Sequence, residues 1–325
     1  MILILYVDDI IITGNDSDKI RETKRALCKQ FEMKILGEPK WFLGIQIKRE
    51  NKVRVTKLFQ TEYIESVLKR FGLDLAKPCS TPICTNQAVS KTTNDPKVET
   101  SLNLNEEIPY WPAVGALNYL ANCTRPDIAY AVNALSRKQS DYNLSDWVEV
   151  ERVMKYLSGT RDLGLIYTGH EDSVAGYSDA SLGVNDPEGF STSGSVIKLF
   201  GDIVSWGSKR QNIVATSSME AKYVIMCRTS KLLIYLSAFC NTLLKTSYVP
   251  ILYEDNRAAI GAAKAEVAKT LKHLVKLNYH FVRKALQNDE LKVIWISTHD
   301  QLADSLTKAL PRPKFEDFRN GLVNL

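Results

Sequence analysis

The feature that most constrains the fold is the order of apolar segments in the carboxy-terminal half of the chain. After Leu163 the sequence predicts four short strands and then one long helix, at residues 163–167, 174–179, 193–199, 202–206 and 217–244. Strand and helix patterns alternate beyond that helix, with segments at residues 251–253, 256–263, 277–286, 291–296 and 302–306. Hairpin strands followed by helix-strand units indicate a mixed-sheet α/β domain of roughly 140 residues.

The amino-terminal half is organised differently, as two hairpins, a linker and a group of helices. Apolar residues on both sides of Asp8 and Asp9 predict a strand, a turn and a second strand. A polar stretch rich in Ser, Thr, Asn, Lys and Pro then has the composition of a linker. We therefore divide the chain into five parts, at residues 1–76, 77–108, 109–160, 161–310 and 311–325. The second part is the linker, the third a helical connector, the fourth the α/β domain and the last a C-terminal tail.

The composition is that of an intracellular globular protein. Of 325 residues, 45% are hydrophobic and 24% are charged, which are ordinary values that exclude overall disorder. We expect no membrane segment, because no apolar run reaches the roughly 18 residues that a bilayer requires. The six cysteines are scattered and indicate reduced thiols, so we expect a cytoplasmic or nuclear protein that is not secreted. The net charge of +5 permits a polyanionic partner without requiring one.

Two adjacent aspartates stand at the tip of the first predicted hairpin. Asp8 and Asp9 repel each other, and they replace the Asn-Gly or Asp-Gly that tight hairpin turns favour. A divalent cation would relieve this repulsion, and phosphoryl-transfer polymerases hold their metal ions with such carboxylates. The alternative interpretation is an acidic turn exposed to solvent.

Four further acids lie where strands end or helices begin in the α/β domain. They are Asp179, Glu220, Asp255 and Asp304. Two divalent ions that hydrolyse a phosphodiester need several carboxylates converging on one point. Each acid also has a structural explanation. Glu220 fits a capping box with Ser217, and the three aspartates fit a strand end, a turn and a helix N-terminus.

Ordered motifs along essentially the whole chain resemble one family. Tyr6-Val-Asp-Asp9 resembles the Tyr-X-Asp-Asp motif of reverse transcriptases, and the surrounding sequence is similar to copia-type retrotransposons. The other segments that carry the resemblance include Phe42-Leu-Gly-Ile45, Gln60-Thr-Glu-Tyr-Ile64, Thr124-Arg-Pro-Asp127, Lys155-Tyr-Leu-Ser-Gly-Thr160, Tyr177-Ser-Asp-Ala180, Ser191-Thr-Ser-Gly194, Ser217-Ser-Met-Glu-Ala221, Glu254-Asp-Asn256 and Gln301-Leu-Ala-Asp304.

The resemblance implies a partial reverse transcriptase in residues 1–76, with the end of a palm, a primer-grip hairpin and the start of a thumb. The family's palm carries a further metal-binding aspartate on an earlier strand, and five residues precede Tyr6. We therefore expect Asp8 and Asp9 to be a vestigial metal pair and the chain alone to synthesise no DNA. A primer-extension assay with Mg²⁺ or Mn²⁺ tests this expectation, and a templated product would contradict it.

The resemblance also implies an RNase H-like domain in residues 161–310, a mixed five-stranded sheet with flanking helices within an α+β and α/β multidomain chain. Asp179, Glu220, Asp255 and Asp304 match the family's catalytic, metal-binding acids, and the implied cofactor is Mg²⁺ or Mn²⁺. The implied reaction is two-metal endonucleolytic cleavage of RNA in an RNA:DNA hybrid. An unrelated serine or cysteine hydrolase is disfavoured because the sequence has no nucleophile-elbow motif.

Basic residues provide candidates for contact with nucleic acid. Residues 264–284 hold six Lys or Arg and one Glu, a local charge of +5, although solvated basic helix faces are common. The two histidines of this segment lack the i, i+4 spacing of a zinc pair, so packed or surface histidines are the alternative. The candidate nucleic-acid-binding residues are Lys209, Arg210, Gln211, Asn256, Lys272, His273 and His280.

Several positions depart from the family's usual sequence. Ser181-Leu-Gly183 replaces an acid or small residue followed by Trp, Lys222 stands where Glu is usual, and Ala268 replaces a His. These changes leave the four proposed metal ligands in place but suggest a copy that has drifted. The alternative to an active nuclease is therefore a catalytically inactive remnant that binds nucleic acid or is purely structural.

Overall fold

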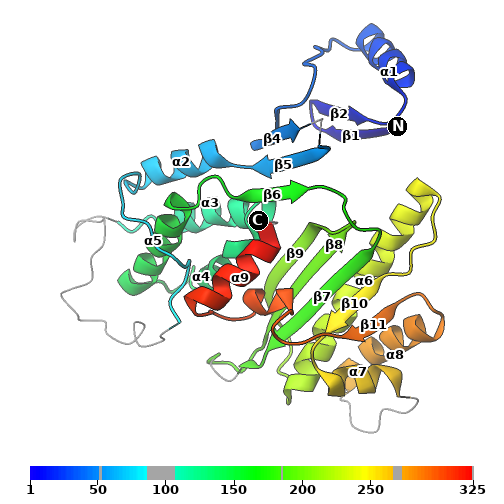
Figure 1. Ribbon diagram of the computed structural model, residues 1–325. Coiled ribbons are helices and arrows are strands. Elements are labelled where there is room, and N and C mark those ends of the chain that lie inside the picture. The colour runs from blue at the N-terminus through cyan, green and yellow to red at the C-terminus, as the bar shows by residue number, and fades with distance from the viewer. Residues whose placement is uncertain (51–52, 86–106, 184–185, 266–272, 324–325) are drawn as a thin grey trace.

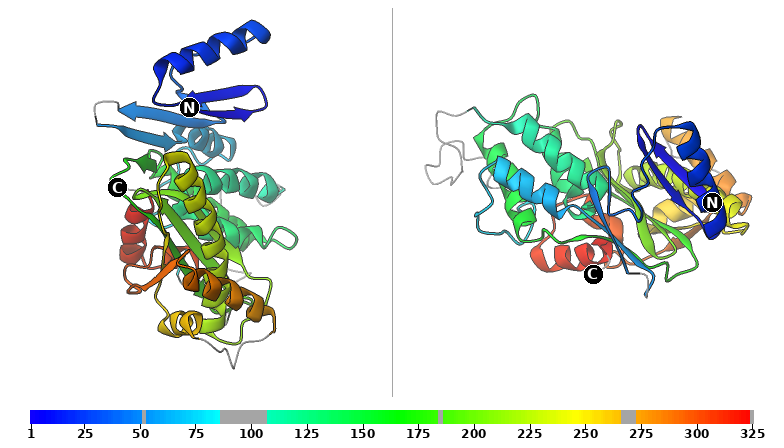
Figure 2. Two further views of the ribbon diagram at one scale, coloured as in Figure 1. Left: turned by 90° about the vertical axis from the view of Figure 1, so that its right-hand side faces the viewer. Right: turned by 90° about the horizontal axis from the view of Figure 1, so that it is seen from above.

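Three β-sheets and a group of helices make up the part of the chain that the computed structural model describes. These described residues are 1–50, 53–85, 107–183, 186–265 and 273–323, without the side chains of 273–279. A hairpin and helix α1 lie at one end of the molecule, a four-stranded sheet follows, and the helical connector and a five-stranded sheet form the rest (Figure 1). Figure 2 shows the same order from two further directions.

Five strands of the described chain form the carboxy-terminal sheet, in the order β11, β10, β7, β8, β9. The strands β7 (Val174–Ser181), β8 (Thr192–Leu199) and β9 (Asp202–Arg210) are antiparallel neighbours. The strands β10 (Ile251–Glu254) and β11 (Lys292–Trp295) run parallel to β7, and helices make the crossovers. The predicted mixed five-stranded sheet with flanking helices is confirmed.

A two-residue turn explains why β8 and β9 form a tight hairpin. Phe200 and Gly201 connect the strands with φ angles of 56° and 90°. Two central residues with positive φ match the right-handed twist of the flanking strands. Gly201 also permits a close approach, because a Cβ there would lie 2.5 Å from Cε1 of His170.

Side chains of β7 alternate between the two faces of the sheet. One face packs against the long helix α6 (Ser218–Leu244), and a Cβ at Gly176 would lie 2.7 Å from Cδ1 of Leu233. Tyr177 packs on the opposite face, against the core that the sheet shares with the connector. Since strand side chains alternate, Asp179 shares the face of Tyr177.

Helices cover both faces of this sheet (Figures 1 and 2). The helices α7 (Arg257–Lys264) and α8 (His273–Gln287) pack beside α6. The short 3₁₀ helix η4 (Leu302–Leu306) packs against β7 and β8 on the other face. The last helix, α9 (Arg312–Val323), contacts η4.

The helix α9 lies in the segment 311–325 that the sequence led us to expect as a C-terminal tail. Its apolar residues recur every three or four positions, and Phe315, Phe318 and Leu322 are buried. These side chains join the core of the connector, which also receives residues from β8 and β9. The expected boundary at residue 310 therefore falls inside a continuous core.

Among the described residues, α6 is the one helix long and apolar enough to cross a membrane by length and composition. The sequence predicts no such span. Half of the apolar window in α6 is buried inside the protein, which is the pattern of a core helix. The contacts of α6 with β7, β8 and α8 account for this burial.

The predicted helical connector is a compact group of helices against β9. It consists of α3 (Tyr110–Cys123), η2 (Pro126–Ile128), α4 (Ala129–Ser136) and α5 (Leu144–Ser158). A capping box starts α5, because Asn143 accepts from the backbone of Asp146 and the Asp146 side chain accepts from the backbone of Asn143. Nε1 of Trp206 on β9 donates to the carbonyl of Ala121 at 2.7 Å and joins connector to sheet.

A fully buried ion pair lies at the centre of the connector. Arg125 donates from Nε and Nη2 to the two carboxylate oxygens of Asp127, at 2.9 and 2.7 Å. The hydroxyl of Tyr156 donates to Asp127 at 2.6 Å, and Nη1 of Arg125 donates to the carbonyl of Thr160 at 2.8 Å. Burial alone would raise the pKa of Asp127, but the charge and hydrogen bonds of Arg125 lower it.

The amino-terminal elements pack less tightly. The strands β1 (Ile2–Tyr6) and β2 (Asp9–Thr13) pair as a hairpin, and α1 (Ser17–Gln30) follows. Among the described residues, α1 buries no side chain, and most of β1 is exposed to solvent. Asp16 caps α1 by accepting from the backbone of Asp18 and Lys19.

A strand expected in the RNase H-like domain belongs instead to the second sheet. This sheet contains β3 (Trp41–Phe42), β4 (Ile45–Glu50), β5 (Val55–Phe59) and β6 (Gly164–Tyr167), and α2 (Thr61–Arg70) follows β5. The strand β6 pairs antiparallel with β5. A Cβ at Gly164 would lie 2.2 Å from the carbonyl oxygen of Leu58, so the pairing depends on glycine. The prediction that residues 163–167 join the carboxy-terminal sheet is therefore wrong.

Candidate active site

Two aspartates meet at one edge of the carboxy-terminal sheet. Asp179 lies near the end of β7, and Asp255 follows directly after β10, the parallel neighbour of β7. Their strands run in the same direction, so the carboxyl ends lie at the same edge. Lys222 reaches between them from the first turns of α6: its Nζ lies 2.7 Å from Oδ1 of Asp179 and also contacts Oδ1 of Asp255.

The second oxygen of each aspartate is held as well. Oγ1 of Thr307 donates to Oδ2 of Asp179 at 2.8 Å, and Oγ1 of Thr298 donates to Oδ2 of Asp255 at 3.0 Å. The side chains of Lys222, Asp179 and Asp255 are 13%, 4% and 8% exposed. Each carboxylate is thus engaged through both oxygens in a largely buried site.

The charges of this cluster stabilise one another. Burial by itself would lower the pKa of Lys222, but the charges and hydrogen bonds of Asp179 and Asp255 outweigh burial and raise it. Burial would raise the pKa of Asp255, whereas the hydrogen bonds from Lys222 and Thr298 and the charge of Lys222 lower it. Lys222 and Asp255 therefore remain charged at neutral pH.

Glu220 does not join the aspartates. Its carboxylate accepts from the backbone N–H of Thr216 at 2.7 Å and from the Thr216 hydroxyl at 2.6 Å, while its own N–H donates to Oγ of Ser217 at 3.2 Å. Ser217 thus caps α6 as the sequence allowed, but the Glu220 carboxylate accepts from Thr216 and not from the N–H of Ser217, so half of the predicted capping box is present. Residues two apart on an α-helix point roughly 200° apart, so the side chains of Glu220 and Lys222 leave α6 in different directions.

Asp304 is buried near the pair but is bound to lysines. Its carboxylate contacts Nζ of Lys308 and lies 2.8 Å from Nζ of Lys314 on α9. Thr307, in the turn after η4, connects this part of the site to Asp179. Within the described residues there is no group of three or more Asp, Glu, His or Cys side chains that could hold a metal ion, so the predicted quartet is not assembled.

Glu254 is a buried acid that the sequence reasoning missed. Its side chain is fully buried, where Oγ of Ser178 donates to Oε2 at 3.0 Å and the backbone of Asn256 donates to Oε1 at 3.1 Å. Burial raises its pKa to about 8, although the charge of Lys222 and these hydrogen bonds act in the opposite direction. The burial of Glu254 could have been predicted from the alternation of side chains along β10, because Glu254 lies on the same side of the strand as the buried Leu252.

The sequence matches known proteins along almost its whole length. Residues 1–85 match the family described as reverse transcriptase (RNA-dependent DNA polymerase). The chain is 38% identical over 97% of its length to the retrovirus-related Pol polyprotein from transposon TNT 1-94 of Nicotiana tabacum. It is 36% identical, again over 97% of its length, to the Pol polyprotein from transposon RE2 of Arabidopsis thaliana. The chain belongs to the Pol polyproteins of copia-type retrotransposons.

The Pol chain spans 24% and 21% of the lengths of these two relatives. The predicted resemblance to the copia-type family is confirmed, and so is the reverse-transcriptase segment at the amino terminus. Among solved structures, an RNase H1 isolated from compost is similar to 42% of the Pol chain and 93% of its own length, with 19% identity and a TM-score of 0.33.

The residues of the Pol chain do not fit the divalent ions that its family implies. Asp179 and Asp255 share the ammonium of Lys222, and Asp304 contacts Lys308 and Lys314. Three lysines therefore balance three aspartates, whereas a metal pair needs carboxylate oxygens whose negative charge is not already neutralised.

Three of the seven predicted nucleic-acid-binding residues have structural partners. Arg210 donates from Nη2 to Oδ1 of Asp186 at 2.7 Å, and its guanidinium lies 4.3 Å from the ring centroid of Phe190. The buried Gln211 donates to the carbonyl of Ala221 at 2.9 Å, and Asn256 caps α7 by accepting from a backbone N–H. These contacts stabilise the sheet edge and the start of α7.

The remaining candidates from that prediction are basic residues and histidines. Lys209 and His280 are exposed to solvent. Nδ1 of His280 lies 3.1 Å from Nη2 of Arg283. Lys272 and the side chain of His273 lie outside the described residues. Nucleic-acid contact by these residues stays a prediction.

An exposed aromatic and a cation beside Asp255 also escaped the sequence reasoning. The guanidinium of Arg257 lies 4.4 Å from the ring centroid of Trp295, and this Trp is 46% exposed. Nε1 of Trp295 donates to the carbonyl of Asp255 at 3.1 Å, which fixes the ring at the edge of the site. Little in the sequence indicates this pair, because Arg257 and Trp295 are far apart in the chain and meet only through the parallel pairing of β10 and β11.

The polymerase pair lies in the exposed amino-terminal hairpin. Val7, with a φ of 50°, and Asp8 form the turn, while Asp9 pairs with Tyr6 in the strand ladder. The turn is thus one residue earlier than the predicted break at Asp8 and Asp9. Both aspartates are exposed, and their role as a vestigial metal pair stays a prediction.

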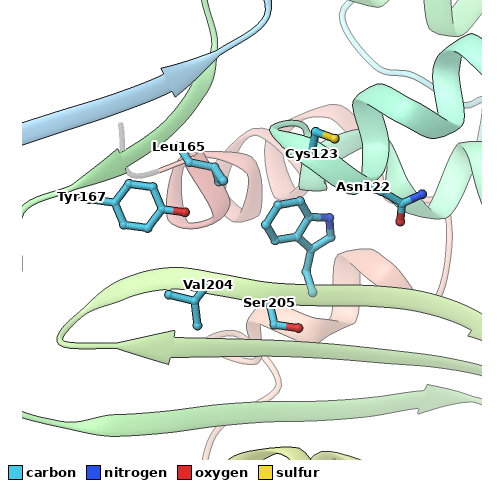
Figure 3. A pocket seen from close by; sticks show the side chains of 7 residues that line it. Asn122, Cys123, Leu165, Tyr167, Val204 and Ser205 are labelled. Carbon is cyan, nitrogen blue, oxygen red and sulfur yellow. The ribbon is translucent and has the colours of Figure 1, made fainter. Parts of the chain in front are cut away.

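A pocket between β6, β9 and the end of α3 lies apart from the aspartate pair (Figure 3). Among the described residues that line it there is no Asp, Glu, His, Lys or Arg. These lining residues are Asn122, Cys123, Leu165, Tyr167, Val204, Ser205 and Trp206.

Proposed function

We propose that this Pol chain binds RNA:DNA hybrids through its RNase H-like domain and does not perform the two-metal cleavage that its family implies. The single observation that carries the proposal is the ammonium of Lys222 between Asp179 and Asp255. The ammonium balances one of the two negative charges of the pair, so the aspartates hold Mg²⁺ or Mn²⁺ less readily than a free carboxylate pair would. The function is therefore that of a catalytically inactive, nucleic-acid-binding derivative of the family.

Binding is supported by the groups around the cluster. Arg257 and Trp295 form an exposed stacked pair at the edge of the site. Lys308 is 44% exposed and Lys314 is 33% exposed where they meet Asp304. Basic side chains contact phosphates, and an exposed ring can stack on a base or contact a ribose.

Cleavage of the RNA strand is the second candidate function. It is favoured by one observation, the placement of Asp179 and Asp255 at neighbouring strand ends. Under this alternative, the lysine would have to leave the aspartates before any hydrolysis. An assay of hybrid binding and RNA cleavage distinguishes the two functions. It uses the full chain, because α9 and the connector share one core with the sheet.

Trp295→Ala is expected to weaken hybrid binding by about fivefold or more, since stacking on one aromatic contributes roughly 1 kcal/mol or more. The measurement is fluorescence anisotropy with a labelled RNA:DNA hybrid in EDTA and low salt. Trp111→Ala is the matched control, because Trp111 is 56% exposed on α3. Trp295→Phe keeps a ring and should retain most of the affinity. Equal affinities for Trp295→Ala and the Trp111 control would contradict the proposed interface.

The same samples, incubated with Mg²⁺ or Mn²⁺, test the second candidate. We expect no cleavage of the RNA strand above the level of Asp255→Asn. Cleavage by the unmodified chain that Asp255→Asn abolishes would establish the nuclease instead.

A further inference from the structure

The cation between the aspartates belongs to the protein itself. Lys222 Nζ contacts one oxygen of Asp179 and one of Asp255, and Thr307 and Thr298 hold the two remaining oxygens. A divalent ion placed between the same aspartates would have to displace this ammonium. It would also have to break or share the hydrogen bonds from the two threonines.

We propose that Lys222 is a built-in counter-ion that replaces a divalent metal, so that the RNase H-like domain folds without metal and does not bind one in this site. The inference extends the proposed function, but it concerns metal affinity and stability rather than hybrid binding. It assigns to one residue, Lys222, the reason why this site does not fit the metal ions of its family.

The need for a cation follows from the acids packed around this point. Asp179 and Asp255 are nearly buried, and Glu254 is fully buried next to Asp255. Closely placed carboxylates repel one another, and burial makes their charges still less favourable. Lys222 supplies one positive charge from a stem that α6 holds in place, and the Lys222 charge also acts on Glu254.

The position of Lys222 on α6 explains how a single residue can exclude the metal. It lies two residues after Glu220, and its Nζ reaches both aspartates, while the Glu220 carboxylate accepts from Thr216. A carboxylate at position 222 would face Asp179 and Asp255 and would change the local charge by two units. That change turns a pair of acids with one charge balanced into three acids that need a cation.

Lys222→Glu therefore reverses the proposed role. In EDTA this variant should have a lower Tm than the unmodified chain, and Mn²⁺ or Mg²⁺ at millimolar concentration should raise its Tm by several degrees. Calorimetry should show that Lys222→Glu binds Mn²⁺ at least about tenfold more tightly than the unmodified chain, because a repelling charge has become a ligand. The unmodified chain should show no metal-dependent change in Tm beyond that of the control.

The matched control is Arg228→Glu, because Arg228 is exposed on the same helix and the substitution makes the same change in charge. Two results would overturn the proposal. One is Mn²⁺ binding by the unmodified chain that Asp255→Asn abolishes. The other is a Lys222→Glu variant that binds Mn²⁺ no better than Arg228→Glu.

If Lys222→Glu fails to fold in EDTA but folds in Mn²⁺, the result supports the proposal. If it folds in neither condition, the comparison of Lys222→Gln with the unmodified chain tests the proposal instead. Lys222→Gln removes the ammonium without adding a ligand, so it should lower the Tm and bind Mn²⁺ more tightly than the unmodified chain. Equal Tm and equal Mn²⁺ affinity for these two proteins would overturn the counter-ion role. Hybrid binding is measured separately in EDTA, so its loss would reject the proposed function and not this inference.

Discussion

Asp127→Ala is expected to destabilise the protein by about 3 to 5 kcal/mol, the usual cost of removing one partner from a buried ion pair. The substitution leaves the guanidinium of Arg125 buried without the carboxylate that accepts two of its hydrogen bonds. The hydroxyl of Tyr156 loses its acceptor as well. The penalty is large because Arg125 cannot lose its proton and cannot reach water without opening the connector.

Urea unfolding followed by circular dichroism measures this effect. Asp141→Ala is the control, since Asp141 is exposed and its removal should change the free energy of unfolding by less than about 0.5 kcal/mol. Replacing both partners, with Arg125→Met and Asp127→Leu, should cost less than Asp127→Ala alone, because no buried charge is left unpaired. A loss below about 1 kcal/mol for Asp127→Ala would show that the ion pair does not support the fold as described.

Glu254→Gln is expected to stabilise the protein at pH 9 and to change its stability little at pH 4. Burial raises the pKa of Glu254 to about 8 in the folded protein, from an ordinary value of 4.5. The folded state therefore holds a proton that the unfolded state has released between these two values. The contribution of Glu254 to the stability of the fold is complete below pH 4.5 and is lost as the pH rises through about 8.

The glutamine keeps the shape and the hydrogen bonds of the protonated acid and does not ionise. The free energy of unfolding of Glu254→Gln should exceed that of the unmodified chain by an amount that grows with pH, to the order of 2 to 4 kcal/mol near pH 9. The measurement is Tm against pH for both proteins, and Glu290→Gln, at an exposed acid before β11, provides the control. Parallel curves for Glu254→Gln and the unmodified chain would mean that Glu254 is already ionised in the folded state at neutral pH.

The order of strands and helices in the carboxy-terminal sheet could be predicted because each element carries its own period. Strand segments at 174–179, 193–199 and 251–253 and the helix at 217–244 correspond to β7, β8, β10 and α6. That Asp179 and Asp255 lie together was implied by the family resemblance, and the parallel pairing of β7 and β10 brings them to one edge of the sheet. Motifs spread along the chain were sufficient to indicate the family, which the relatives confirm.

Pairing partners and side-chain directions were not predictable in the same way. The pattern of residues 163–167 predicts a strand but does not indicate which strand it pairs with. Gly164 allows the close approach that places β6 beside β5. Glu220 and Lys222 are both near the start of one helix, and the sequence does not state which of them faces the aspartates. In the fold, the Glu220 carboxylate accepts from Thr216, and the Lys222 ammonium contacts both aspartates.

The amino-acid sequence alone thus determined the family, the type of most main elements and the positions of the acids along the chain, because these depend on local patterns. Tertiary structure alone decided that Glu254 is buried, that Asp304 meets two lysines and that an ammonium lies between Asp179 and Asp255. These outcomes depend on which side chains converge from distant segments. The balance between burial and opposite charge at that point then shifts the pKa values of Lys222, Glu254 and Asp255.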